Sequence, residues 1–364
     1  MQKIRVGKLT GTKSKTVKLS NTKSMAYAMM LLSKAYNIEL FLFSKEDVDF
    51  ENKTIRGLFF ENDEHSGEIN QIFKTVPIPP LIDAANHIVG EFLIELERYS
   101  RLVQPFRKPK KLRTYEKLKE DGRYAHLLIP TIPVANFDDI KKALAEHNGR
   151  LVLKSTGGSG GKSVLAIRRN ADEFEFHKGN EVERLNETQA VEKVAQILSQ
   201  TNYIAQPFIV SQTRFNEPCD LRIHCRRGKG GAFFVNIFPR IGSADGVVSN
   251  ISSGGYAIDS KAFFKREFGE TWKQKHDETL RFGKEFANYY QSLFPKKTTS
   301  NIGIDIGFMR EGDEIKYYLF EVNTYMAPNM AMNNNFITVN PCDIINQLEY
   351  YRYLWNKHEL GSVG

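Results

Sequence analysis

The stretch IGIDIGFMREGDEIKYYLFEVN, residues 302–323, carries the pattern from which the rest of the chain can be interpreted. β-branched and aromatic residues fill two runs, 302–309 and 315–322, and glycine and acidic residues occupy positions 310–314 between them. Two such runs around a glycine-containing turn are typical of a β-hairpin. The stretch therefore predicts two strands joined by a turn at 310–314.

Oxygen-bearing side chains interrupt this apolar hairpin at Asp305, Glu321 and Asn323. Glu321 and Asn323 are two residues apart, so a strand places both side chains on one face. Pairing across the hairpin could bring Asp305 to the same end. Carboxylates and an amide carbonyl are hard oxygen ligands that suit Mg²⁺ and leave room for phosphate oxygens. Taken alone, the segment favours an ordinary hairpin with a capping aspartate and a surface glutamate, so a metal site depends on the rest of the chain.

Length and composition are those of a globular protein. At 364 residues, with 41% hydrophobic and 26% charged residues, the chain can form two or three domains with a sizeable core. No apolar run approaches membrane-spanning length, and residues 1–5 lead into a strand-like run without the apolar segment of a signal peptide. Cys219, Cys225 and Cys342 lack metal-ligand spacing and favour reduced thiols. We expect a cytoplasmic protein without a membrane partner.

The net charge of +8 favours anionic partners. Much of the excess comes from seven lysines and arginines within residues 107–119. Such a run is more often a solvated helix face than a nucleic-acid site, and no nucleic-acid motif accompanies it. We therefore expect no nucleic-acid partner, and the charge leaves the oligomeric state open.

The order of predicted elements suggests three domains. A strand at 4–9, a helix at 22–36 and a strand at 38–43 predict a small α/β domain, to which we assign residues 1–104. A further amphipathic helix is expected over 90–102. We assign the remainder to two domains, 105–205 and 206–364.

A glycine-rich segment lies between two apolar runs in the second domain. The run RLVLK at 150–154 is followed by STGGSGGKS at 155–163 and then by the apolar run VLAI at 164–167. Four glycines within residues 157–161 let the backbone approach a ligand and point its N–H groups at phosphate oxygens. A hairpin tip needs only one or two glycines, so a phosphate-binding loop is the better interpretation.

The end of this segment imitates a Walker A motif, G-x-x-x-x-G-K-[ST]. The first glycine of that motif would fall at Thr156, and a β-like run follows Ser163 where a helix should begin. A P-loop NTPase is therefore the weaker interpretation. Lys154, at the end of the preceding strand, offers another way to hold phosphates, from beneath a flexible glycine flap.

Candidate anion-binding arginines follow in the third domain. The segment 220–226 alternates polar and apolar residues, which places Arg222 and His224 on one strand face, and 232–238 is its expected antiparallel partner. Arg222 and Arg240 could be surface arginines, but on strands facing a phosphate loop they suit an anion clamp. His224 lacks any ligand or nucleophile pattern and is assigned a structural role.

These ordered motifs together resemble an ATP-grasp domain over about residues 104–355. The sequences RIG at 240–242 and VSNISSGG at 248–255 are similar to the endospore coat-associated YheC/YheD-type branch of that superfamily. The resemblance implies an α+β fold in which two α+β subdomains grip ATP, preceded by the small α/β domain.

The resemblance also implies roles for individual residues. It implies that phosphates are held by basic and small residues, namely Lys111, Lys154, Ser159, Gly160 and Gly161. Gln206 and Ile209 would border the adenine. Two Mg²⁺ ions would be held by Asp305, Glu321 and Asn323, the last also serving nucleotide binding. The transferred phosphoryl group would face Arg222, Arg240 and Asn250.

The leading hypothesis is an ATP-dependent carboxylate–amine ligase. A small or anionic carboxylate would attack the γ-phosphate of ATP to give an acyl phosphate and ADP, and an amine from an amino acid or peptide would displace phosphate to form an amide. Charge neutralisation and positioning suffice for this chemistry without a protein nucleophile. The alternatives are a phosphotransferase acting on a hydroxyl, and a nucleotide-binding coat or structural protein without turnover.

Overall fold

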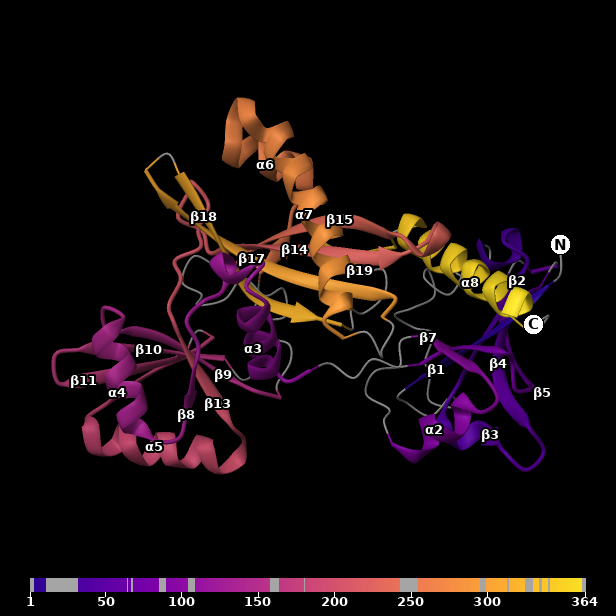
Figure 1. Cartoon of the computed structure of the whole chain (residues 1–364), viewed down its shortest axis with the longest axis horizontal. Coiled ribbons are helices and arrows are strands. Elements are labelled where there is room, and N and C mark those ends of the chain that lie inside the picture. Colours follow the sequence, from indigo (N-terminus) through magenta and orange to yellow (C-terminus); the bar gives the residue numbers. More distant parts are fainter. Residues whose placement is uncertain are drawn as a thin grey trace.

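The computed structural model describes residues 3–10, 32–63, 65–66, 68–84, 90–103, 109–157, 164–179, 181–242, 255–294, 299–312, 314–324, 330–333, 336–339 and 341–361. In these ranges the chain forms sheets of seven, six and five strands and one two-stranded sheet. We call the larger three the N-terminal, middle and C-terminal sheets. Figure 1 shows them as three groups, with β14 and β17 of the C-terminal sheet in the centre.

The N-terminal sheet has the strand order β3-β4-β2-β1-β6-β7, with β5 paired to β4. β1 lies between β2 and β6 and is parallel to both, which confirms the predicted strands at 4–9 and 38–43. Only residues 32–36 of the predicted helix at 22–36 lie within the described ranges. The strands are β1 (Ile4–Leu9), β2 (Ile38–Phe43), β3 (Val48–Asp49), β4 (Thr54–Asn62), β5 (Ile69–Pro77), β6 (Leu81–Asp83) and β7 (Arg101–Val103), and the 3₁₀ turn η3 is Lys45–Asp47.

The helix predicted over 90–102 is shorter in the structure. Helix α2 (Glu91–Glu97) ends before β7, which pairs in parallel with β6. The prediction was therefore wrong over 98–102: the helix ends at Glu97, and at 101–102 a long-range strand pairing overrides local helix periodicity.

The middle sheet has the order β12-β11-β10-β9-β13-β8 and carries two helices. Both helices begin at an asparagine whose side chain accepts backbone N–H groups, Asn136 for α4 and Asn186 for α5. Phe137 and Phe174 pack edge to face in the core between helix and sheet. The elements are β8 (Ile132–Val134), α4 (Phe137–Glu146), β9 (Arg150–Ser155), β10 (Val164–Asn170), β11 (Glu173–Lys178), β12 (Glu181–Leu185), α5 (Glu187–Gln200) and β13 (Tyr203–Pro207).

The C-terminal sheet, in the order β16-β15-β14-β17-β18, contains the predicted hairpin as β17 and β18. Helix α7 packs closely against β14 and β15. At Gly283 of this helix there is no room for a side chain, since an added Cβ would lie only 2.6 Å from Cγ2 of Ile223. The elements are β14 (Cys219–Arg227), η5 (Lys229–Gly231), β15 (Phe233–Ile241), β16 (Tyr256–Ala257), α6 (Ser260–Phe268), η7 (Gly269–Thr271), α7 (Trp272–Ser292), β17 (Asn301–Glu311) and β18 (Glu314–Asn323).

Two helices connect these sheets across large sequence distances. Helix α3 (Lys111–Asp121), followed by η4 (Ala125–Leu127), contributes Leu118 to the core of the C-terminal sheet, although it precedes the middle sheet in sequence. Helix α8 (Pro341–Gly361) buries Leu348 and Tyr351 against the N-terminal sheet. β19 (Met330–Asn333) and β20 (Phe336–Val339) form the two-stranded sheet. Among the helices in the described ranges, none has the length and hydrophobicity that a membrane span requires.

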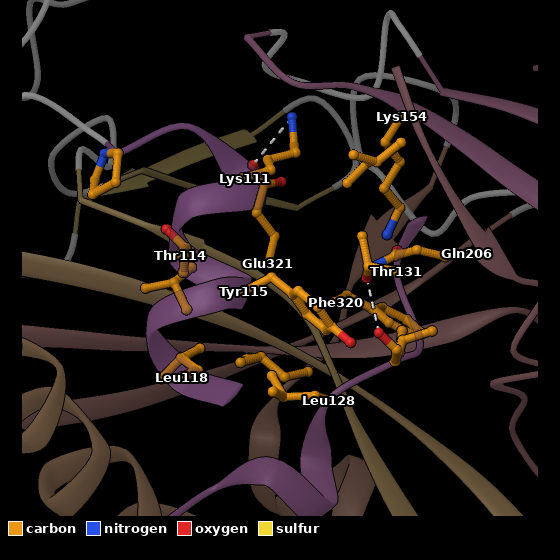
Figure 2. Close-up of a pocket in the computed structure, with 15 residues that line it drawn as sticks. Lys111, Thr114, Tyr115, Leu118, Leu128, Thr131, Lys154, Gln206, Phe320 and Glu321 are labelled. Carbon is orange, nitrogen blue, oxygen red and sulfur yellow. Dashed lines mark hydrogen bonds and ion pairs between the residues drawn. The ribbon is translucent and has the colours of Figure 1, made fainter. Parts of the chain in front are cut away.

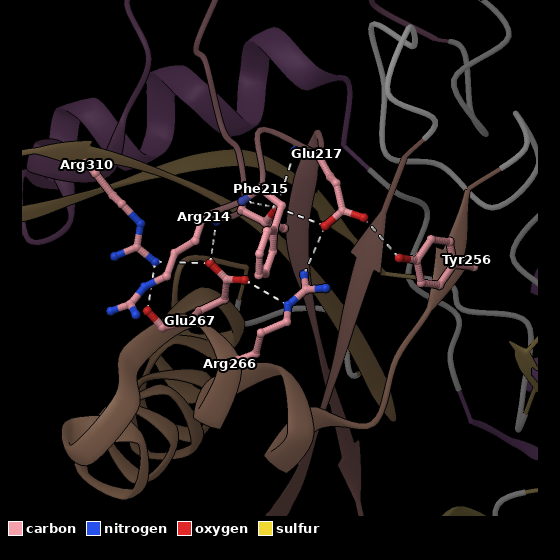
Figure 3. A network of polar contacts seen from close by, with 8 residues as sticks. Arg214, Phe215, Glu217, Tyr256, Arg266, Glu267 and Arg310 are labelled. Carbon is pink, nitrogen blue, oxygen red and sulfur yellow. Dashed lines mark hydrogen bonds and ion pairs between the residues drawn. The ribbon is translucent and has the colours of Figure 1, made fainter.

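A buried carboxylate forms hydrogen bonds with the linker between the middle and C-terminal sheets. Glu267 of α6 is fully buried and accepts hydrogen bonds from the Arg214 backbone N–H (2.8 Å), from Nε of Arg266 (3.0 Å) and from Nη2 of Arg310 (3.2 Å). Figure 3 shows these groups converging on the carboxylate from the linker, α6 and β17. Glu267 therefore connects the linker, α6 and the hairpin strand.

Replacing Glu267 with glutamine should destabilise the protein. Glu267→Gln keeps the volume but removes the negative charge that Arg266 and Arg310 share. We expect the free energy of unfolding to fall by about 2 kcal/mol, measured by chemical denaturation. The control is Glu270→Gln at an exposed site three residues further on, with an expected change below about 0.5 kcal/mol. Equal effects of both substitutions would contradict this role.

Candidate functional site

A cavity of about 520 Å³, including its open mouth, lies between α3, the middle sheet and β18. Its charged end holds Lys111 of α3, Lys154 of β9 and Glu321 of β18. Figure 2 shows these side chains with Gln206 and Thr131 on the cavity wall. The remaining walls are mainly apolar and are formed by Pro109, Thr114, Tyr115, Leu118, Leu128, Ile129, Ile204, Leu319, Phe320 and Val322.

Two lysines and a carboxylate are close together at the charged end. Nζ of Lys111 lies 3.7 Å from Oε1 of Glu321 and donates to the carbonyl of Ser155 at 3.1 Å. Burial, the largest cause, lowers the pKa of Lys154 to about 8 against the opposing charge of Glu321, and Lys111 also acts to lower it. This end of the cavity therefore suits an anion that would be shared between two ammonium groups.

The glycine-rich segment joins two antiparallel strands. β9 and β10 pair with Lys154 opposite Val164. Because a strand begins at Val164, the segment does not have the loop-to-helix geometry of a P-loop, and that interpretation is wrong. Ser159, Gly160 and Gly161 lie outside the described residues, as does Asn250.

Gln206 and Thr131 form the polar part of the otherwise apolar end. Nε2 of Gln206 donates to Oγ1 of Thr131 at 2.8 Å, while its Oε1 is buried and has no hydrogen-bond partner among the described residues. The predicted neighbour Ile209 lies beyond β13 and is not among the residues that line the cavity. An unpaired buried acceptor beside aromatic walls fits a planar ligand that carries an amino group.

Sequence reasoning did not find Tyr115, Thr131 or Phe320. Tyr115 follows Lys111 by four residues, so helical spacing alone could have placed it on the same face. Thr131 and Phe320 carry no such signal, because long-range packing of the sheets brings them to the cavity.

Strand pairing in the hairpin places its acidic residues at the same end, as predicted from the sequence. Asp305 is opposite Glu321, and Asn323 donates to Oδ2 of Asp305 at 3.4 Å. The register shifts between Asp305 and Ile306, which marks a β-bulge at this point. The structure therefore brings the predicted metal-ligating residues Asp305, Glu321 and Asn323 together.

Arginines from neighbouring strands pair with the acidic residues. Arg222, opposite Asp305 on β14, contacts both carboxylate oxygens, with Nη2 2.8 Å from Oδ2. Nε of Arg240 donates to Asp220 at 2.7 Å, and its Nη2 lies 3.3 Å from Asp305. Burial acts to lower the pKa of Arg240, but Asp220 and Asp305 outweigh it and raise that pKa.

The polar face of β14 continues beyond Arg222. His224 is buried, and burial lowers its pKa to about 4, so the ring is neutral at pH 7. Nε of Arg226 donates to Asp343 of α8 at 2.8 Å. The contact of Arg226 with Asp343 connects β14 to α8, and a structural role for His224 stays a prediction.

The donor set at Asp305, Glu321 and Asn323 fits a magnesium ion. Mg²⁺ prefers oxygen ligands and usually completes its shell with water and phosphate oxygens, so one or two carboxylates suffice. Over the part of the chain that the structure describes, no group of three or more His, Cys, Asp or Glu forms a self-contained metal site.

Two α+β lobes around a cavity with paired lysines and carboxylates define an ATP-grasp protein. The chain belongs to the YheC/D-like ATP-grasp family, whose model matches residues 102–359. It is 22% identical over 140 residues to endospore coat-associated protein YheC of Bacillus subtilis (strain 168), a match that covers 37% of this chain and 38% of that protein.

Solved structures share the fold at low identity. D-cycloserine synthetase DcsG matches with a TM-score of 0.51 and 14% identity, over 96% of this chain and 99% of that one. An ADP complex of purK, N5-carboxyaminoimidazole ribonucleotide synthetase, matches with a TM-score of 0.51 and 13% identity, over 92% of this chain and 71% of that one. D-alanyl-alanine synthetase A from Vibrio cholerae O1 biovar eltor str. N16961 gives 0.50 and 12%, over 97% of both chains. These likenesses confirm the predicted ATP-grasp fold.

The low pKa of Lys154 should make nucleotide binding depend on pH. Free Lys154 loses its proton near pH 8, whereas bound phosphate would raise its pKa, so binding should take up a proton above pH 8. We expect the association constant for Mg-ATP to fall by up to about tenfold per pH unit above that value, where the terminal phosphate is already ionised. Calorimetry in buffers of different ionisation enthalpy measures both effects. Lys154→Arg should abolish them, and an unchanged dependence in that variant would contradict the assignment.

Proposed function

We propose that this chain is an ATP-dependent carboxylate–amine ligase that forms an amide through an acyl phosphate and releases ADP and phosphate. The observation that carries the proposal is the junction of the cavity's charged end with the paired side chains of Asp305 and Arg222. A nucleotide in the cavity would direct its phosphates toward that junction. The family and fold support ATP-dependent ligase chemistry in general.

We assign nucleotide contacts by position. Lys111 and Lys154 would hold phosphates at the charged end, and Gln206 would border the base. The glycine segment with Ser159, Gly160 and Gly161 would close over the phosphates, and Ile209 would lie next to the base from the linker. We retain the division into residues 1–104, 105–205 and 206–364 as part of this proposal, and α8 of the third domain packs against the first.

Asp305, Glu321 and Asn323 would hold Mg²⁺, for which we propose two ions. Bound there, magnesium would neutralise phosphate charge. Arg222 and Arg240 would stabilise negative charge that develops on the transferred phosphoryl group, and Asn250 would assist from its loop. In this structure Asp305 forms an ion pair with Arg222, and Glu321 with Lys111. When nucleotide and magnesium bind, Arg222 and Lys111 would leave these carboxylates and contact phosphate oxygens instead.

The substrates we propose are a small or anionic carboxylate and an amine from an amino acid or peptide. The net charge of +8 supports an anionic substrate. The N-terminal domain would border the substrate cleft, and a cytoplasmic location would supply ATP. No nucleic acid or membrane partner is part of this proposal.

Removal of Glu321 should abolish magnesium-dependent nucleotide binding. In Glu321→Ala the carboxylate facing Asp305 is lost, so adding Mg²⁺ should no longer strengthen ATP binding, which we expect it to do by about tenfold or more in the parent. Calorimetry with and without Mg²⁺ measures this difference. Glu311→Ala, exposed at the end of β17 in the same hairpin, is the control and should behave like the parent. Retained magnesium dependence in Glu321→Ala would contradict the metal assignment.

Arg222 should matter more for turnover than for nucleotide binding. We expect Arg222→Lys to lower ADP release by about 100-fold or more, because a single ammonium cannot reproduce the bidentate guanidinium, while the dissociation constant for Mg-ATP changes by less than about threefold. ADP release is measured with pools of carboxylates and amines, and mass spectrometry identifies the product. A phosphate ester in place of an amide would favour a phosphotransferase, and binding without turnover would favour a nucleotide-binding coat protein.

A further inference from the structure

Thr131 and Gln206 form a hydrogen-bond chain whose direction is determined by its last acceptor. Oγ1 of Thr131 donates its one proton to the backbone carbonyl of Ile129 at 2.8 Å, and a carbonyl can only accept. Toward Gln206, at 2.8 Å, the threonine oxygen can therefore act only as an acceptor. The amide of Gln206 must turn its NH₂ group toward Thr131 and its oxygen away.

The oxygen that is turned away from Thr131 is a buried atom of a residue that lines the cavity. Within the part of the chain that the structure describes, Oε1 of Gln206 has no hydrogen-bond partner, and the residue is only 8% exposed. Gln206 and Thr131 both line the cavity, and Figure 2 shows them side by side next to Lys154. A buried acceptor without a partner is costly, and a ligand that supplies an N–H group would remove that cost.

We propose that Thr131 is a positioning residue that sets the base specificity of the nucleotide site. By fixing the amide of Gln206, it presents an acceptor to the ligand and so favours adenine, whose exocyclic N6 amine is a donor. Guanine carries the O6 acceptor at the corresponding position, which would face Oε1 without a proton between them. The inference rests on the proposed function, since it requires that the cavity binds the base of ATP.

Binding of Mg-ATP and Mg-GTP to the full chain tests this proposal without any need for turnover. In Thr131→Val the acceptor is lost and the amide of Gln206 can rotate, so its NH₂ group can reach guanine O6. We expect the preference for ATP over GTP, about 100-fold or more in the parent, to fall by at least about tenfold in this variant. Thr131→Ser keeps the hydroxyl and should therefore retain the preference for ATP over GTP.

Thr279→Val is the matched control. Thr279 is 9% exposed, like Thr131, and its hydroxyl also donates to a backbone carbonyl, that of Lys275, but it lies on α7 away from the cavity. The Thr279→Val variant should prefer ATP over GTP to the same extent as the parent. An unchanged preference in Thr131→Val, or an equal loss in Thr131→Ser, would overturn the positioning role while leaving nucleotide binding intact. If the parent binds neither nucleotide, the proposed function itself fails.

Discussion

The ion pair between Arg222 and Asp305 is the interaction on which the site depends. It joins β14 to β17 by contacts to both carboxylate oxygens, and Arg240 bridges the same aspartate to Asp220. Charges this well buried are tolerated only when each has a partner, so removal of one leaves another uncompensated. The cluster is thus neutralised by the chain's own residues. In the proposed function, nucleotide and metal would compete with these ion pairs, so their binding would require the side chains to rearrange.

The cavity beside this cluster is divided by chemistry. Lys111, Lys154 and Glu321 give one end its charge, and aromatic and aliphatic side chains give the other end its apolar walls. Three elements that are distant in sequence meet there: α3, the middle sheet and β18. Small changes in how the two sheets sit relative to each other would therefore alter both ends together, and the contacts of Glu267 with the linker and β17 restrain that arrangement.

A second polar network connects the N-terminal sheet to the rest of the molecule. The Tyr351 hydroxyl and the Gln347 amide of α8 both donate to the buried carboxylate of Asp83, at 2.6 and 2.8 Å. One turn earlier in α8, Asp343 accepts from Arg226 of β14. Helix α8 thus joins the carboxyl end of a parallel strand of the N-terminal sheet to β14, the strand that carries Arg222.

Local pattern was enough to predict much of this protein. Periodicity and turn chemistry, which act over a few residues, predict the hairpin, the spacing of Glu321 and Asn323, and the strands around the glycine segment. Tertiary structure alone decided that residues 101–103 pair with β6, that α8 packs on the first sheet, and that Thr131 and Phe320 line the cavity. These features depend on contacts between segments that are tens to hundreds of residues apart in the sequence. A local sequence pattern does not indicate which distant segment will pack against it.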